Sequence, residues 1–179
     1  TWVSVGGTLR LTGAGCIGTA GSNFLTLGQQ YVGGGTLQYD SGATSYFTTI
    51  NVSQSNAATG TLNQTAGVIG VSGNVNLTPT ADCVSFCNLS GGTLAVGGTL
   101  SVGIRGNQAA TMTLSGTGVL TAAVIAVPDF SNNPGNYKPS YGQFIQNGGA
   151  ATVGALVIAQ TSSDTNSHVG TFELNGGVF

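Results

Sequence analysis

Apolar residues return along this chain at a constant interval of about 25 residues, and two of them stand two positions apart in each repeat. A spacing of two is the period of a β-strand, in which alternate side chains point to opposite faces. A fixed repeat of this length is typical of solenoids and propellers. We therefore expect short strands stacked coil upon coil, with equivalent residues aligned in ladders. The two leading series are Leu25, Ile50, Val75, Leu100 and Ile125, and Leu27, Val52, Leu77, Val102 and Val127.

Three further series share the interval, although the last of them is less uniform. They are Leu37, Leu62, Cys87 and Met112; Tyr39, Gln64, Leu89 and Leu114; and Thr44, Ile69, Leu94 and Val119. Propeller blades need about 40–50 residues per repeat, so a propeller does not fit. The pattern predicts an all-β fold, a parallel β-solenoid (β-helix) with about 25 residues per coil and roughly six to seven coils. Residues 1–179 form a single domain in this prediction.

The chain divides into a regular array and flanking segments. Residues 24–127 carry the array, and residues 1–11 form an N-terminal half-coil. Residues 128–140 are predicted to be an inserted loop, because their three prolines do not fit the interior of a strand ladder. Residues 141–179 resume the pattern as the final coils, which end in a half-coil. Within the loop, Phe130, Tyr137 and Lys138 are candidates for a lateral contact or for binding carbohydrate. The alternative is that the loop has no binding role.

The two ends of the chain match different halves of the repeat. Residues 5–11 match residues 96–102 of the second half, and residues 172–179 match residues 87–94 of the first half. Joined tail to head, residues 176–179 and residues 1–11 of a second copy would complete one coil, with about three residues to spare. The predicted subunit interface consists of Trp2, Val3, Val5, Leu9, Leu11, Phe172, Leu174, Val178 and Phe179. The alternative is a segment cut from a longer solenoid.

The composition restricts the classes of partner. Only 4% of the residues are charged, and the net charge is −2. The basic residues Arg10, Arg105 and Lys138 are too few for a nucleic-acid interface or a polybasic membrane patch. The apolar runs are strand-sized, so no membrane insertion is expected. We expect the chain to associate with itself as a head-to-tail homopolymer, with surface glycans as a further candidate partner. The scarcity of Lys and Glu, together with three cysteines, favours an extracellular or cell-surface location.

The repeat at residues 89–103, with residues 62–67 one turn earlier, resembles the Gly-Gly-Thr-Leu repeats of bacterial surface β-helix proteins. These include autotransporter passenger domains and related secreted or surface-anchored repeat proteins. The resemblance covers most of residues 35–127 and, more weakly, residues 141–179. It implies a right-handed parallel β-helix on or outside the cell, with an adhesive or structural role.

The candidate chemical groups are sparse. The acidic residues are Asp40, Asp82, Asp129, Asp164 and Glu173, and no two of them fall in one ladder. Because glycoside-cleaving β-helices need clustered carboxylates, we do not expect an enzyme. We expect no cofactor and no metal, since the cysteines and the single histidine, His168, have no grouped ligands.

Two sets of residues leave alternatives open. Cys83 and Cys87 either form a disulfide that closes one turn or remain two buried thiols. Cys16 is free or pairs between subunits. The Asn-x-Ser/Thr triplets begin at Asn51, Asn63, Asn76 and Asn88. These asparagines either carry glycans or hydrogen-bond to one another along the stack.

These observations together predict a structural subunit of an extracellular fibre. The alternative is a β-helical segment of a larger cell-surface adhesin that binds glycans or a host surface.

Overall fold

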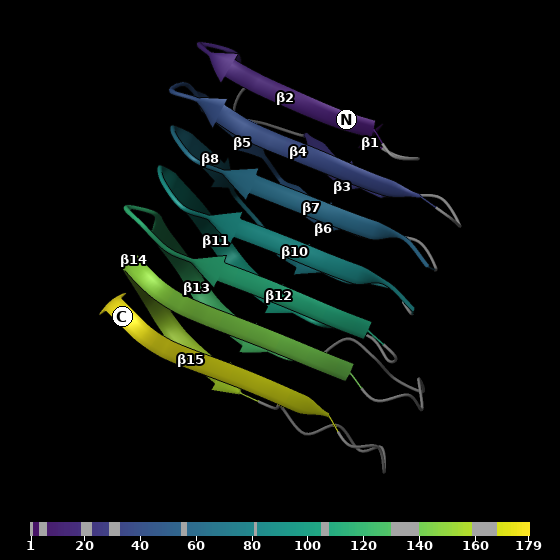
Figure 1. Cartoon of the computed structure of the whole chain (residues 1–179), viewed down its shortest axis with the longest axis vertical. Helices are drawn as coiled ribbons and strands as arrows, with labels where there is room; N and C mark the ends of the chain where they lie inside the picture. Colours follow the sequence, from purple (N-terminus) through teal and green to yellow (C-terminus); the bar gives the residue numbers. More distant parts are fainter. Residues whose placement is uncertain are drawn as a thin grey trace.

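The computed structural model describes residues 2–3, 7–18, 23–28, 33–54, 57–80, 82–104, 108–129, 140–158 and 168–179. In these residues the chain winds into a parallel β-solenoid with no helix, as the sequence predicts (Figure 1). Each turn of about 25 residues advances the chain by one strand spacing, and every strand pairing is parallel. Since no helix is present in this part of the chain, none of it forms a membrane-spanning helix.

Three faces run along the axis, and we name them in chain order. The first face is a stack of strands that includes the N-terminal part of β14. Its strands are β2 (Gly7–Gly13), β4 (Gly34–Ser41), β7 (Thr59–Gln64), β10 (Val84–Leu89), β12 (Gln108–Leu114), β14 (Ser140–Ile158) and β15 (Val169–Val178). Successive strands of this face pair in register from β2 to β15.

The second and third faces share the long strands, which continue around the corner between them. The second face comprises β5 (Thr44–Phe47), β8 (Val68–Val71) and the first parts of β11 (Thr93–Val102) and β13 (Val119–Val127), followed by the middle of β14. The third face comprises β1 (Trp2–Val3), β3 (Phe24–Leu27), β6 (Thr49–Val52), β9 (Val75–Leu77) and the last parts of β11, β13 and β14.

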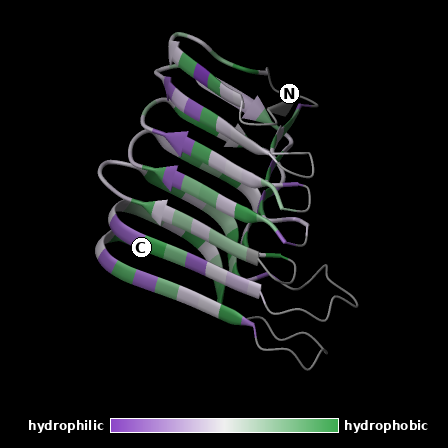
Figure 2. Cartoon of the chain, turned by 45° about the vertical axis from the view of Figure 1, so that its right-hand side comes forward, coloured by the Kyte–Doolittle hydropathy of each residue, from purple (hydrophilic) through white to green (hydrophobic). Residues whose placement is uncertain are grey.

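The core follows the ladders that the apolar pattern predicts. Leu25 pairs with Ile50, and Ile50 with Val75, and all three side chains are fully buried. On the first face, Leu37, Leu62, Cys87 and Met112 form a second buried ladder. Figure 2 shows hydrophobic and hydrophilic residues alternating along the strands, which is the period of two. Burying one such aliphatic side chain contributes about 1.5–3 kcal/mol.

One predicted series is wrong by one residue at two coils of the second face. Ser45 rather than Thr44 pairs with Ile69, and Leu120 rather than Val119 pairs with Leu94. Ser45 and Leu120 are fully buried, whereas Val119 is exposed. The corner before this face varies in length between coils, so a constant interval fails across it. A slip of one residue exchanges the inner and outer sides of a strand.

Residues 5–11 were expected to match the second half of the repeat, and this assignment is also wrong. Leu9 pairs with Leu37 and Leu11 with Tyr39, so β2 lies on the first face. The cause is the motif itself. Gly-Gly-Thr-Leu ends at Leu37 on the first face, at Leu94 on the second and at Leu100 on the third. The motif therefore marks a corner followed by a strand and does not identify the face.

Candidate functional site

The last coil presents an uncovered edge. Among the described residues, β15 pairs only with β14. Phe172 stacks on Phe144 with ring centroids 5.1 Å apart, and Phe179 meets Phe172 edge-on at 4.8 Å. Leu174 and Val178 nevertheless remain 53% and 69% exposed, although Leu89 and Leu114, at the ladder position of Leu174 in earlier coils, are buried. The edge is apolar because Leu174 and Phe179 occupy core positions that no further described coil covers, while Val178 continues the outward ladder of Val119 and Ala150.

The third face ends one strand earlier than the first. β14 supplies its outermost described strand there, in which Leu156 is half-buried and Ile158 is 46% exposed. The C-terminal end of the solenoid is therefore stepped: the first face extends one coil beyond the third (Figure 1).

Gln146 holds the outermost coil in place. Its Nε2 donates to the Val178 carbonyl at 2.9 Å, and the side chain is fully buried. Gln64 has the same ladder position in an earlier coil, and it donates to the Thr93 carbonyl at 2.9 Å. The 25-residue pattern puts Gln64 in an apolar series and does not predict this role. In both cases the amide binds a carbonyl at the corner of the following coil.

The N-terminal end is stepped in the opposite sense. β2 pairs only with β4 among the described strands, and its inward Leu9 and Leu11 are half-buried. β1 pairs with β3, with Trp2 opposite Thr26 and Val3 opposite Leu27, so the third face begins one strand before the first. The side chains of the predicted interface residues Trp2 and Val3, and Val5 as a whole, lie outside the described residues.

Charged and polar groups mark the first face at this end. Arg10 contacts Asp40 on the neighbouring strand through Nε and Nη2, both at 2.9 Å. Gln38 and Thr65 donate to the other carboxylate oxygen of Asp40 at 2.6 and 2.8 Å. Hydrogen bonds from Gln38, then Thr65, and the nearby Arg10 lower the pKa of Asp40. At the opposite end, Glu173 accepts a hydrogen bond of 2.8 Å from Gln143.

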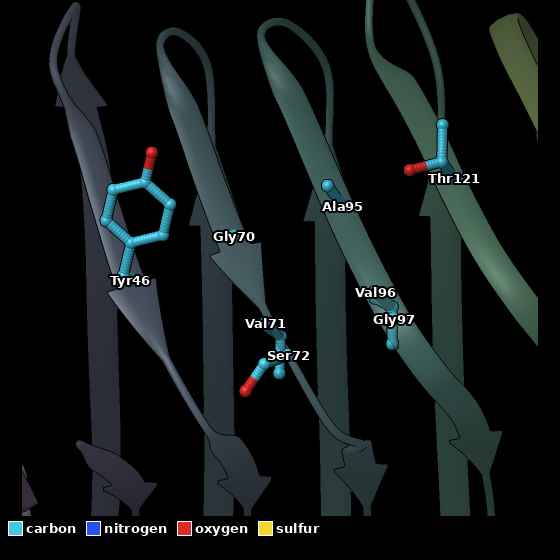
Figure 3. A pocket seen from close by; sticks show the side chains of 8 residues that line it. All are labelled: Tyr46, Gly70, Val71, Ser72, Ala95, Val96, Gly97 and Thr121. Atoms are coloured by element: carbon cyan, nitrogen blue, oxygen red, sulfur yellow. The ribbon is translucent and has the colours of Figure 1, made fainter. Parts of the chain in front are cut away.

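A shallow groove crosses the second face. It has a volume of about 340 Å³ and is lined mainly by apolar atoms. Figure 3 shows Tyr46 on one strand, with Gly70, Ala95 and Thr121 on the strands beside it. The Tyr46 ring leans over Gly70, where an added Cβ would lie 3.0 Å from it, and Tyr46 is 43% exposed. The groove is thus an aromatic ring beside a strip of small residues.

Cys83 and Cys87 are not joined by a disulfide in the described part of the chain, which shows the alternative of two buried thiols. The intervening residues are extended in β10, which carries the two sulfurs apart. Cys87 faces the core, and burial raises the pKa of its thiol to about 12. Cys83 is buried beside Thr80, with Oγ1 and Sγ 3.2 Å apart, and Cys16 is exposed.

The outward asparagines form ladders. Asn76 donates to Asn51 and Asn88 to Asn63, both at 2.8 Å, as the hydrogen-bonded alternative predicts. The loop residues Phe130, Tyr137 and Lys138 lie outside the described residues.

The acidic residues do not gather into a catalytic group in the described ranges. Asp129 is buried and accepts a hydrogen bond of 2.6 Å from Ser101, while Asp40 and Glu173 lie at opposite ends of the first face. Among the residues that the structure describes, no three histidine, cysteine or acidic side chains are grouped as metal ligands.

Comparison of the chain with known protein families, with curated proteins and with solved structures finds no match.

Proposed function

We propose that this chain is a structural subunit of an extracellular fibre and polymerises head to tail. The supporting observation is that both described ends of the solenoid are open parallel edges with uncovered core positions. Leu174 and Phe179 are exposed at one end, and Leu9 and Leu11 are only half-buried at the other. Open strand edges bind further strands readily. A contact between two different ends that does not close generates a filament.

The steps at the two ends are complementary. With a second copy continuing the stack, its β2 covers β15, so Leu9 lies over Phe172 and Leu11 over Leu174. Its β1 covers the end of β14 on the third face, since Trp2 has the ladder position of Val157 and Val3 that of Ile158. Each strand pairing adds main-chain hydrogen bonds, and each exposed aliphatic side chain that becomes fully buried contributes about 1.5–3 kcal/mol.

The register of β1 and β2 changes how many residues are expected at the seam, the place where Phe179 of one copy meets the first residues of the next. Val178 pairs with Ala150, so Phe179 follows at the position of Ala151. Between that position and Trp2 of the next copy, which has the position of Val157, residues 152–156 have no counterpart among the described residues. The sequence prediction of about three spare residues at the seam is therefore replaced by a short gap on the second face. A hollow of about 400 Å³ beside Val153 and Phe179 marks this place.

The test is electron microscopy of the purified chain by negative stain, with the variant Leu174→Asp. Wild-type protein should form long uniform threads. Leu174→Asp should remain as short separate rods, because it buries a carboxylate in the contact. Since Leu174 is exposed in the single chain, circular dichroism should show an unchanged fold. Phe86→Asp, an exposed residue of β10 in the interior of the first face, is the matched control and should form threads. Monomeric wild-type protein, or threads from Leu174→Asp, would contradict the proposal.

The groove beside Tyr46 supports a second candidate function, binding of glycans by a segment of a larger cell-surface adhesin. An exposed tyrosine ring offers an apolar face with a polar tip, which suits the C–H faces and hydroxyls of a sugar ring. Retention of the chain on insoluble cellulose and chitin tests this candidate. Tyr46→Ala should lose retention, whereas Tyr141→Ala, an exposed tyrosine on the first face, should keep it. Equal retention of both variants would rule out the groove.

A further inference from the structure

One outward ladder of the first face carries opposite charges at its two ends. It lies between the two inward ladders of that face and continues in register through every coil. Its members are Arg10, Gln38, Asn63, Asn88, Thr113, Ile145 and Glu173. The five interior positions are uncharged. In a chain in which only 4% of the residues are charged, a cation therefore stands at one edge of this ladder and an anion at the other.

We propose that this ladder sets the register and polarity of the contact between copies, with Arg10 of one copy paired to Glu173 of the next. The inference rests on the proposed fibre and names its partner, a second copy of this chain. It also assigns two further interface residues, both at the centre of the strands that meet.

The positions of the two side chains support the pairing. Continuing the parallel register of the first face places Leu9 over Phe172, Arg10 over Glu173 and Leu11 over Leu174. Adjacent strands lie about 4.8 Å apart, a distance that long side chains span. Arg10 already reaches Asp40 on its neighbouring strand at 2.9 Å, and Glu173 already accepts from Gln143 on its own neighbour at 2.8 Å. Both side chains therefore extend along the sheet towards a neighbouring strand, and the Arg10 side chain is 67% exposed. At the seam, Arg10 would stand between Asp40 of its own copy and Glu173 of the other.

The apolar pattern alone does not fix the register between two copies, and the charge pair distinguishes the registers that it leaves open. A slip of one residue is unfavourable because it turns the apolar side chains of Leu9 and Leu11 outward into solvent. A slip of two residues keeps the alternation of inner and outer positions, but it moves Arg10 onto Thr171 or Asn175. Two like ends brought together would oppose Arg10 to Arg10, or Glu173 to Glu173. Charge complementarity of this kind contributes more to specificity and register than to affinity.

The test uses the charge reversals Arg10→Glu and Glu173→Arg, alone and mixed in equal amounts at low salt. Each variant alone opposes like charges at every contact. The concentration at which half of the protein sediments as polymer should then rise about threefold to tenfold. In the mixture, contacts alternate between the native pair and the swapped pair, so polymerisation should return close to the wild-type concentration. Thr113→Glu, which adds an anion to the same ladder in an interior coil, is the matched control and should polymerise like the wild type.

The outcomes separate this inference from the proposed function. If wild-type protein forms threads and both reversed variants do so at the same concentration, the charge register is wrong and the fibre proposal stands. If the folded variants fail alone and also fail when mixed, Arg10 and Glu173 do not pair. Restoration in the mixture cannot come from the Arg10–Asp40 contact, because that contact lies within one copy: it is lost in Arg10→Glu and intact in Glu173→Arg, and mixing changes neither. If wild-type protein does not polymerise, the fibre proposal fails, and this inference fails with it.

Discussion

Each side chain of this solenoid takes its role from its neighbours in the coils before and after it. Asn175 donates to Asn147 at 3.0 Å, as the other outward asparagines do in their own ladders. Repetition of one polar residue converts an isolated surface amide into a hydrogen-bonded series. Inside the core the same logic applies to Cys87, which lies between Leu62 and Met112 and behaves as a small apolar residue.

At the residue scale, we predict that the Cys87 thiol is protected from labelling reagents in the folded protein. We also predict that its burial makes the free energy of unfolding fall as the pH becomes alkaline. Burial holds the pKa of this thiol at about 12, compared with 9.0 for an exposed thiol. Between these values the unfolded state loses the proton that the folded state retains. The stabilising contribution is therefore complete below pH 9.0 and is lost as the pH rises towards about 12. Urea unfolding should show a smaller alkaline loss of stability in Cys87→Val than in the wild type.

Thiol labelling provides an independent measurement of the same environment. In the folded protein at pH 8, Cys16 should react quickly with iodoacetamide, and Cys87 should react only after unfolding. Labelling of both thiols at the same rate in the folded chain would contradict the buried assignment.

At the element scale, the corners control which face each strand joins. Gly92 turns the chain from the first face to the second with φ of 74°, and an added Cβ would lie 2.4 Å from the Ala66 carbonyl carbon. Gly177 has φ of 89° at the same corner of the last coil, close to the Val178 carbonyl that Gln146 binds. The corners thus combine a backbone conformation that favours glycine with a close approach of the preceding coil.

This distinction predicts different costs for two glycine substitutions. Gly13 also has a positive φ of 63°, but no atom lies within 4 Å of an added Cβ there. Gly13→Ala should therefore lower the free energy of unfolding only by the backbone strain, about 1 kcal/mol. Gly92→Ala should lower it by at least about 1 kcal/mol more, because its Cβ meets backbone that must shift. Equal losses in urea unfolding would show that steric contact at the corner is unimportant.

At the scale of the whole molecule, the fold depends on burial and hydrogen bonding and very little on charge. The only ion pair described in the structured ranges joins Arg10 and Asp40, and the Arg10 side chain is 67% exposed. Exposed pairs of this kind contribute little to stability. The charges that do matter, in our proposal, act between copies.

A contrast in salt dependence follows from this arrangement. The melting temperature of the separate chain should change by less than about 4 °C between low and high salt, since screening removes about 1 kcal/mol or less. The half-polymerisation concentration of the wild type should rise over the same change, because salt screens the Arg10–Glu173 pair. Differential scanning fluorimetry of Leu174→Asp, which should not polymerise, measures the first quantity, and sedimentation of the wild type measures the second. A large salt effect on the melting temperature would mean that charge contributes to the fold itself.

The repeat in the sequence is enough to predict the solenoid, its period and most of its core. Stacked coils impose one fixed interval on every inward position, so Leu25, Ile50 and Val75 reveal their ladder without any coordinates. It also indicated the apolar residues at both edges, Leu9 and Leu174 among them. The tertiary structure alone decided which face each terminal strand joins, because the Gly-Gly-Thr-Leu motif precedes strands on all three faces. The sequence pattern matches Leu9 to the wrong half of the repeat, which separates Arg10 and Glu173 into different ladders. The opposite charges at the two ends of one ladder are therefore not evident from the sequence. Periodicity along a chain specifies the interval between coils, whereas the corners, whose lengths vary, determine which ends can meet.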